Sequence, residues 1–122
     1  DVTIVATGHL VWEALQAAEE LEKQGISAEV INIHTIKPLD EEIILNSVKK
    51  TGCLVSAEEH NYLGGMGESI SGLLGLKHPC PMEMVATQDT FGESGTPAQL
   101  MTKYGLDKNA IIGKVKHVIK RK

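Results

Sequence analysis

Residues 53–69, CLVSAEEHNYLGGMGES, contain an apolar run, then acidic residues and a histidine, and then a glycine-rich segment. The apolar run has the length and composition of a buried strand, and apolar positions after the glycines recur with the period of a helix. A strand that passes through a short junction into a helix is typical of a parallel sheet with helical crossovers. The stretch predicts an α/β fold and also contains the first candidate site.

The same alternation of strand and helix extends along the chain. Strands are predicted at residues 2–6, 28–33, 53–57 and 82–86, with helices between them and two more helices after residue 95. Crossovers between parallel strands are right-handed. We therefore predict one domain over residues 1–122, a three-layer α/β/α fold with a mostly parallel sheet of four to five strands in the order 2-1-3-4.

Capping residues and glycines set the predicted helix ends. Asp40 is predicted to cap the second helix, and Gly25 and Gly52 to end the first and second. A capping box at residues 96–99 and Asp107 are predicted to start the last two helices. The first helix is predicted to bury a stripe made of Val11, Ala14, Leu15, Ala18 and Leu21.

Composition argues against several classes of function. The chain has a net charge of -4 and only four aromatic residues, one Trp, two Tyr and one Phe, so stacking on nucleic-acid bases is not expected. Seven of the 12 basic residues lie at positions 103–122. We interpret them as the solvated face of a helix rather than a nucleic-acid footprint.

Apolar runs and cysteines bear on the location of the protein. No apolar run approaches the roughly 20 residues of a membrane span, so no membrane partner is expected. Cys53 and Cys80 are predicted to be reduced core thiols, which favours an intracellular, cytoplasmic protein. The chain begins inside a strand pattern and without Met, which suggests that it was excised from something longer.

Candidate site residues follow two neighbouring strands of the predicted sheet. In an open parallel sheet a ligand binds at the carboxyl ends of the strands where the strand order reverses. That crevice would lie between His9 and the run Glu58, Glu59, His60 and Asn61. A carboxylate beside a histidine can orient it for proton transfer or metal binding. However, the HxxxH and CxxC spacings of metal sites are absent, and polar residues at strand ends are commonly structural.

Gly64, Gly65 and Gly67 stand at a predicted helix start, where backbone N–H groups can bind phosphate. The Walker A lysine and hydroxyl residue are missing, and Glu68 would repel an anion. Close backbone packing explains these glycines better, together with Gly72 and Gly75 further along the helix. We therefore interpret the junction as a candidate interface or crevice, with no catalytic, cofactor-binding or metal-binding residue assigned.

Four motifs in register resemble a known family. They are residues 1–8 (DVTIVATG), 30–40 (VINIHTIKPLD), 58–68 (EEHNYLGGMGE) and 91–100 (FGESGTPAQL). Together they resemble the C-terminal domain of transketolase-like, thiamine-diphosphate-dependent enzymes, and look most like transketolase itself. Deoxyxylulose-phosphate synthase and the beta subunit of 2-oxo-acid dehydrogenases share the domain and remain alternatives.

The resemblance implies an enzyme that moves a two-carbon ketol unit between sugar phosphates, with thiamine diphosphate and Mg²⁺ held by its N-terminal and middle domains or subunit. The Gly-Asp-Gly motif of the metal-diphosphate site does not occur in these residues. The chain alone is therefore expected to bind no cofactor, to be inactive and to support a homodimer. The alternative from another class is a free-standing module that binds an anion or a protein in the crevice between His9 and His60.

Overall fold

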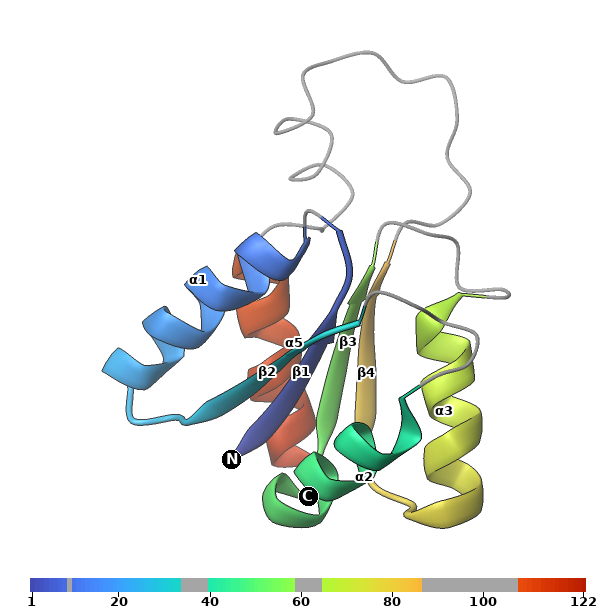
Figure 1. Ribbon diagram of the computed structural model, residues 1–122. Coiled ribbons are helices and arrows are strands. Elements are labelled where there is room, and N and C mark those ends of the chain that lie inside the picture. The colour runs from blue at the N-terminus through green and yellow to red at the C-terminus, as the bar shows by residue number, and fades with distance from the viewer. Residues whose placement is uncertain (9, 34–39, 59–64, 87–107) are drawn as a thin grey trace.

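The structure, a computed structural model, describes residues 1–8, 10–33, 40–58, 65–86 and 108–122. Strands and helices alternate through these residues, as the sequence predicts (Figure 1). The elements are β1 (Val2–Ala6), α1 (Leu10–Lys23), β2 (Ala28–Asn32), α2 (Glu41–Thr51), β3 (Leu54–Glu58), α3 (Met66–Lys77), β4 (Met82–Ala86) and α5 (Lys108–Lys120). The helix predicted at residues 96–104 and the Asp107 cap lie outside the described residues.

The four strands form one parallel sheet in the order β2-β1-β3-β4. Strands β1 and β3, which are far apart in sequence, are central neighbours, with Thr3 opposite Leu54 and Ala6 opposite Ala57. This confirms the predicted α/β class and the predicted strand order. The strand order reverses between β1 and β3, so the carboxyl ends of these two strands mark the switch point.

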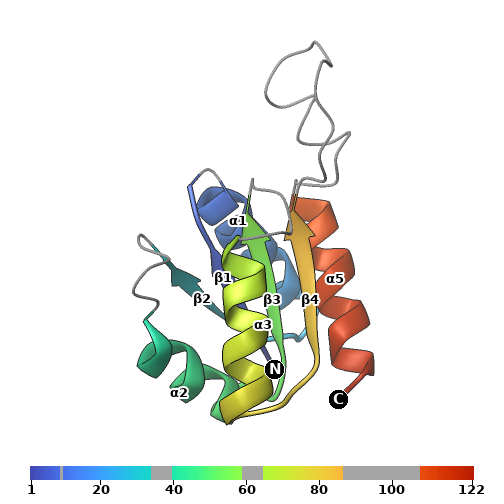
Figure 2. The ribbon, with the colours of Figure 1, turned by 90° about the vertical axis from the view of Figure 1, so that its right-hand side faces the viewer.

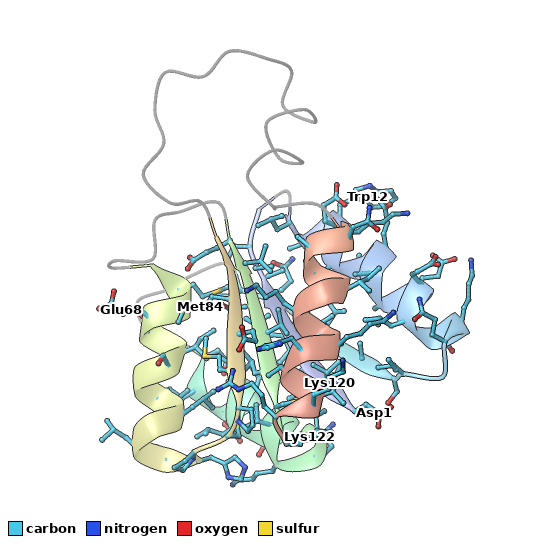
Figure 3. All side chains as sticks on the ribbon, turned by 180° about the vertical axis from the view of Figure 1, so that it is seen from behind. Asp1, Trp12, Glu68, Met84, Lys120 and Lys122 are labelled. Carbon is cyan, nitrogen blue, oxygen red and sulfur yellow. The ribbon has the colours of Figure 1, made fainter. Side chains whose placement is uncertain are left out.

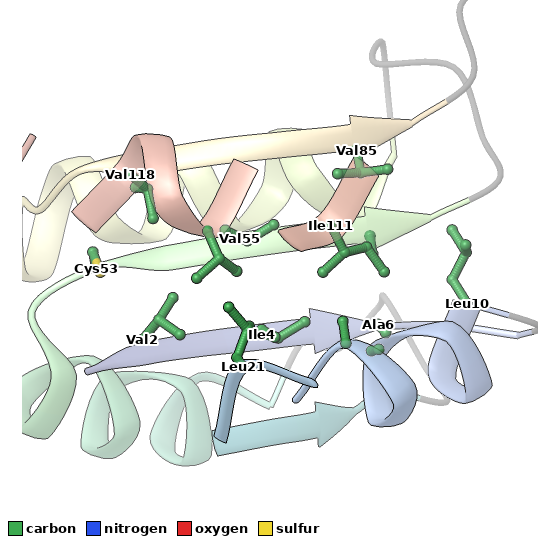
Figure 4. Close-up of a cluster of buried hydrophobic side chains, with 14 residues drawn as sticks. Val2, Ile4, Ala6, Leu10, Leu21, Cys53, Val55, Val85, Ile111 and Val118 are labelled. Carbon is green, nitrogen blue, oxygen red and sulfur yellow. The ribbon is translucent and has the colours of Figure 1, made fainter. Parts of the chain in front are cut away.

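The helices form a layer on each side of the sheet (Figure 2). Alternate residues of the strands face opposite layers, so each face has its own apolar cluster. One cluster joins β1 and β3 to α1 and α5, and includes Ile4, Val55, Leu21 and Ile111 (Figure 4). The other cluster lies under α2 and α3 and includes Val5, Leu54, Ile44, Ile70 and Leu74.

The buried stripe of α1 differs in part from the predicted one. The residues with full burial are Leu10, Ala14, Ala17 and Leu21. Leu15, predicted to be in the stripe, is 49% exposed. It lies one position, or about 100° of helix rotation, from Ala14 and so points away from the sheet. The prediction for Leu15 was therefore wrong, and an apolar residue remains on the outer face of α1.

The predicted helix ends are confirmed where the structure describes them. Gly25 and Gly52 adopt positive φ angles of 83° and 82°, which glycine tolerates without a steric penalty. The N–H of Gly52 donates to the carbonyl oxygen of Val48 at 2.8 Å and closes α2. At the other end of α2, the Asp40 carboxylate accepts from the N–H of Ile43 at 3.4 Å.

A buried group of hydroxyls joins α2 to the sheet. The Oγ1 atom of Thr3, in β1, lies 2.6 Å from Oγ of Ser47 and 2.8 Å from Oγ1 of Thr51. Thr51 also donates to the carbonyl oxygen of Cys53 at 3.1 Å. Because a buried polar group without a partner is costly, these bonds fix the position of α2 against β1.

Replacing Thr3 by valine should lower the free energy of unfolding by about 1 to 3 kcal/mol, because two buried hydroxyls lose a partner while the side-chain volume is kept. Urea denaturation measures this. Thr3→Ser retains the hydroxyl and is the control, with an expected loss of about 1 kcal/mol for the missing methyl group. Equal stability of Thr3→Val and the unchanged chain would show that the hydroxyl group contributes nothing.

Candidate functional site

The predicted junction contains a buried carboxylate that binds the start of α3. Glu58, the last residue of β3, is only 1% exposed. Its Oε2 atom accepts a hydrogen bond from the N–H of Met66 at 2.7 Å, and its Oε1 atom accepts from the N–H of Gly67 at 2.8 Å. The N-cap residue, Gly65, has no side chain to do this. A strand residue thus caps the helix in place of the usual neighbouring side chain.

This arrangement decides what else can bind at the α3 N-terminus. The first N–H groups of a helix and its dipole attract negative charge, which makes such an end a ready site for phosphate. Here the Glu58 carboxylate already accepts from two of those N–H groups, and a phosphate would have to displace it or lie beside it. The geometry therefore disfavours the phosphate-cradle interpretation of the glycines.

Gly67 allows α3 to approach the sheet closely. A Cβ atom at Gly67 would lie 2.9 Å from Sδ of Met84, 3.0 Å from Oγ of Ser56 and 3.3 Å from Oε1 of Glu58. Figure 3 shows Met84 beside the end of α3 that carries Glu68. The close packing predicted for Gly67 is thus present, and its partners are β3 and β4 of the same chain.

Gly72 and Gly75 behave differently from Gly67. Both are exposed, and a Cβ atom at either would meet nothing within 4 Å. Nothing in the described part of this chain packs against these two glycines, so their predicted close packing concerns a partner that lies outside it. A neighbouring domain or subunit on this face of α3 stays a prediction.

Carboxylates also cap two other helices. The Oε2 atom of Glu13, in the first turn of α1, accepts from the N–H of Lys108 at the start of α5, at 3.0 Å. Asp40 caps α2. Three helix starts that follow the carboxyl ends of strands are therefore bound to acidic side chains of the chain itself. Glu13 was missed by sequence reasoning, because 95 residues separate it from Lys108.

The structure brings together three of the candidate residues and leaves the others untested. Glu58, Gly65 and Gly67 meet at the start of α3. The remaining candidates lie outside the described residues: His9, Glu59, His60, Asn61 and Gly64. Their grouping in a crevice or at an interface stays a prediction. Ser56 was not predicted; its buried Oγ has no hydrogen-bond partner among the described residues.

The described segments contain two free thiols and no group of side chains that could hold a metal ion. No three His, Cys, Asp or Glu residues there are grouped so that they could hold a metal ion. Cys53 and Cys80 are free thiols. Burial raises the pKa of both thiols, so they remain protonated at neutral pH and are poor nucleophiles. None of the described helices is long and apolar enough to cross a bilayer.

Comparison with known families agrees with this geometry. The model of the transketolase C-terminal domain family matches residues 1–111. The chain belongs to that family. The features described above therefore belong to a transketolase C-terminal domain. They are the parallel sheet and the closely packed start of α3 with Gly65 and Gly67.

Relatives of this transketolase C-terminal domain are much longer than the chain. It is 48% identical over 122 residues to a 6-deoxy-6-sulfo-D-fructose transketolase subunit of Clostridium sp. (strain MSTE9), spanning 100% of this chain and 38% of the relative. It is 39% identical over 119 residues to mouse transketolase, spanning 97% of this chain and 19% of the relative. A 1-deoxy-D-xylulose-5-phosphate synthase of Desulforudis audaxviator is 37% identical over 114 residues, 92% of this chain and 18% of that relative.

A solved structure has the same fold. It is described as "Split gene transketolase, inactive beta4 tetramer" and aligns with a TM-score of 0.94 at 41% identity, over 98% of this chain and 39% of that chain. The domain thus spans about two fifths or less of the proteins it resembles here.

Glu58→Gln should lower the free energy of unfolding by about 2 to 4 kcal/mol, because the amide NH₂ would face a backbone N–H and the charge at the helix start is lost. Urea denaturation measures the loss, and hydrogen exchange should show faster opening of the Met66 and Gly67 amides. Glu22→Gln, on the exposed surface of α1, is the control and should change stability by less than about 0.5 kcal/mol. A Glu58→Gln variant as stable as this control would contradict the capping role.

Alanine substitution should lower the stability of the domain at Gly67 and raise it at the other two glycines of α3. Gly67→Ala should destabilise the domain by about 1 to 3 kcal/mol, because its Cβ would press on Ser56 and Glu58. Gly72→Ala and Gly75→Ala should stabilise it by about 0.5 to 1 kcal/mol, because alanine favours helix and finds open space. Thermal unfolding of the three variants compares them directly, and a stabilised Gly67→Ala would refute the close approach.

Proposed function

We propose that this chain is the C-terminal domain of a transketolase whose complete enzyme transfers a two-carbon ketol unit between sugar phosphates. The family match and the relatives named as transketolases support this proposal. Because a 1-deoxy-D-xylulose-5-phosphate synthase is also a relative, that enzyme remains an alternative. The beta subunit of 2-oxo-acid dehydrogenases remains a further alternative, because it shares the domain.

The domain's proposed contribution is structural. The observation that carries this view is the Glu58 carboxylate at the α3 N-terminus, which accepts from the N–H groups of Met66 and Gly67. The described residues therefore do not fit a diphosphate with its Mg²⁺ at this helix start. Thiamine diphosphate and Mg²⁺ would be held by the N-terminal and middle domains or by a separate subunit, and the chain alone would be inactive.

Assembly with other chains is the second part of the proposal. The domain spans only 38% of one transketolase subunit and 19% of another transketolase, so further domains or subunits are needed to complete the enzyme. The similar split-gene structure is described as a beta4 tetramer, which supports an oligomeric role. We propose that the domain supports a homodimer of a cytoplasmic enzyme.

A sulfonated ketose is a second candidate substrate. The relative with 48% identity is named for 6-deoxy-6-sulfo-D-fructose, while the mouse transketolase is 39% identical. A sulfonate and a phosphate are both anions at the end of a sugar chain, and the same ketol transfer would serve either. The free-standing module that binds an anion or protein between His9 and His60 is the alternative from another class.

Calorimetry of the isolated chain with thiamine diphosphate and Mg²⁺ should show no binding, and micromolar affinity would contradict a cofactor site in other domains. In the complete enzyme, ketol transfer should be measured with a ketose phosphate and with 6-deoxy-6-sulfo-D-fructose as separate donors. Activity with neither donor would contradict the proposed function. Faster turnover of the sulfonated donor would establish the second candidate.

His60→Ala in the complete enzyme separates an interface from a site. Loss of the dimer with retained activity per dimer is the result expected for an interface. An intact dimer without activity would place His60 in a site and favour the crevice alternative. Sedimentation velocity measures the first quantity and the ketol-transfer assay the second.

A further inference from the structure

The sulfur-containing side chains of the described residues differ in their access to solvent and in their reactivity. Met66 and Cys53 are fully buried, whereas Met82, Met84 and Cys80 are partly exposed. Burial raises the pKa of the Cys80 thiol, which therefore stays protonated and reacts slowly with oxidants. A thioether reacts without having to ionise. The two methionines of β4 are thus the reactive sulfur groups in the described segments.

Met84 differs from Met82 in the groups that surround its sulfur atom. Met82 packs against the apolar cluster that lies under α2 and α3. The Sδ atom of Met84 lies beside the start of α3, at the end that carries Glu68 (Figure 3). A Cβ atom at Gly67 would be 2.9 Å from this Sδ atom and 3.0 Å from Oγ of Ser56. The sulfur and the hydroxyl oxygen therefore flank the same point.

Ser56 and Met84 are also direct neighbours across the sheet. They are register partners in the parallel strands β3 and β4, so their side chains project from the same face. Ser56 is 1% exposed, and its Oγ has no hydrogen-bond partner among the described residues. A thioether sulfur is only a weak acceptor, and Met84 in its reduced form does not satisfy this hydroxyl.

The Glu58 carboxylate is the other polar group near this point. Its Oε1 atom lies 3.3 Å from the Cβ position of Gly67, but it already accepts from the N–H of Gly67 at 2.8 Å. Ser56 donates to neither of its two neighbours. A buried hydroxyl without a partner is uncommon in a folded protein and calls for an explanation. A strong acceptor added to the sulfur of Met84 would give Ser56 its partner.

Hydrogen peroxide adds such an acceptor to methionine. A lone pair of the thioether sulfur attacks one peroxide oxygen, the O–O bond breaks, and the other oxygen leaves as water after proton transfer. The sulfur is oxidised by two electrons to a sulfoxide, and the peroxide is reduced. The new oxygen is polar and accepts hydrogen bonds, and methionine sulfoxide reductases reverse the change. The modification is therefore reversible.

We propose that Met84 is a site of reversible oxidation by peroxide, and that the hydroxyl of Ser56 donates a hydrogen bond to the oxygen of its sulfoxide. Of the three atoms nearest to the Cβ position of Gly67, only Oγ of Ser56 carries a proton to donate. The Glu58 carboxylate repels the new oxygen and turns it towards Ser56. The oxidised side chain then stays in the fold, and Glu58 continues to cap α3.

Peptide mass spectrometry after a short exposure of the 122-residue chain to hydrogen peroxide tests whether the sulfur of Met84 is accessible. Susceptibility of methionine to oxidation follows exposure, so Met84 should react at least about tenfold faster than Met66, which is 0% exposed. The same chain unfolded in urea is the control, and there the two methionines should react at equal rates. A folded chain in which Met84 is as slow as Met66 overturns the proposal.

Ser56→Ala tests the hydrogen bond, because its effect should differ between the reduced and the oxidised chain. Met82→Leu and Met101→Leu are introduced throughout, so that the accessible sulfoxide is the one at Met84. In the reduced chain, Ser56→Ala removes a hydroxyl without a partner, and urea denaturation should find equal or higher stability. After oxidation, it should raise the ratio of unfolded to folded chain by about tenfold, the equivalent of one hydrogen bond.

Two matched variants in the same background are the controls. Ser71→Ala, at an exposed serine of α3, should act equally on the reduced and the oxidised chain. Met84→Leu should make stability insensitive to peroxide, with or without Ser56. An equal effect of Ser56→Ala on both forms overturns the proposal, and so does a chain that unfolds on oxidation whether or not Ser56 is present. The ketol-transfer assay of the complete enzyme judges the proposed function independently of these results.

Discussion

The buried Glu58 carboxylate is the interaction on which the junction between β3 and α3 depends. Its two oxygens accept from successive N–H groups of a helix whose N-cap is glycine. Glycine at these positions lets α3 lie close to β3 and β4, but it removes the side chain that would ordinarily cap the helix. The strand must then supply the cap, and a buried carboxylate is stable there because both of its oxygens are satisfied.

Acidic caps shape what this edge of the sheet can bind. Glu58, Glu13 and Asp40 occupy the starts of α3, α5 and α2, the places where an α/β domain commonly binds phosphate. These three helix starts are therefore occupied by carboxylates of the chain itself. The chain also spans only a minor part of its relatives, and we propose that the substrate chemistry belongs to the complete protein.

The sequence predicts the fold well because its signals are local. The alternation of strands and helices, Asp40, Gly25 and Gly52 each act within a few residues, and all are found as expected. The site was harder to predict because its contacts are not local: Glu58 reaches eight residues along the chain, and Glu13 reaches the start of α5. A fully buried strand that ends in glutamate was a usable signal for the Glu58 contact, since a buried carboxylate requires hydrogen-bonding or charged partners.

Leu15 was assigned to the buried face of α1, and its exposure shows that the predicted face was rotated relative to the observed one. The 3.6-residue period of the apolar positions assigned it to the core, but the buried positions of α1 are Leu10, Ala14, Ala17 and Leu21, and Leu15 is exposed. Apolar residues that the core does not need are candidates for a contact with another chain. Leu15, at 49% exposed, and Trp12, at 66% exposed, are thus apolar side chains that the core of the described domain does not use.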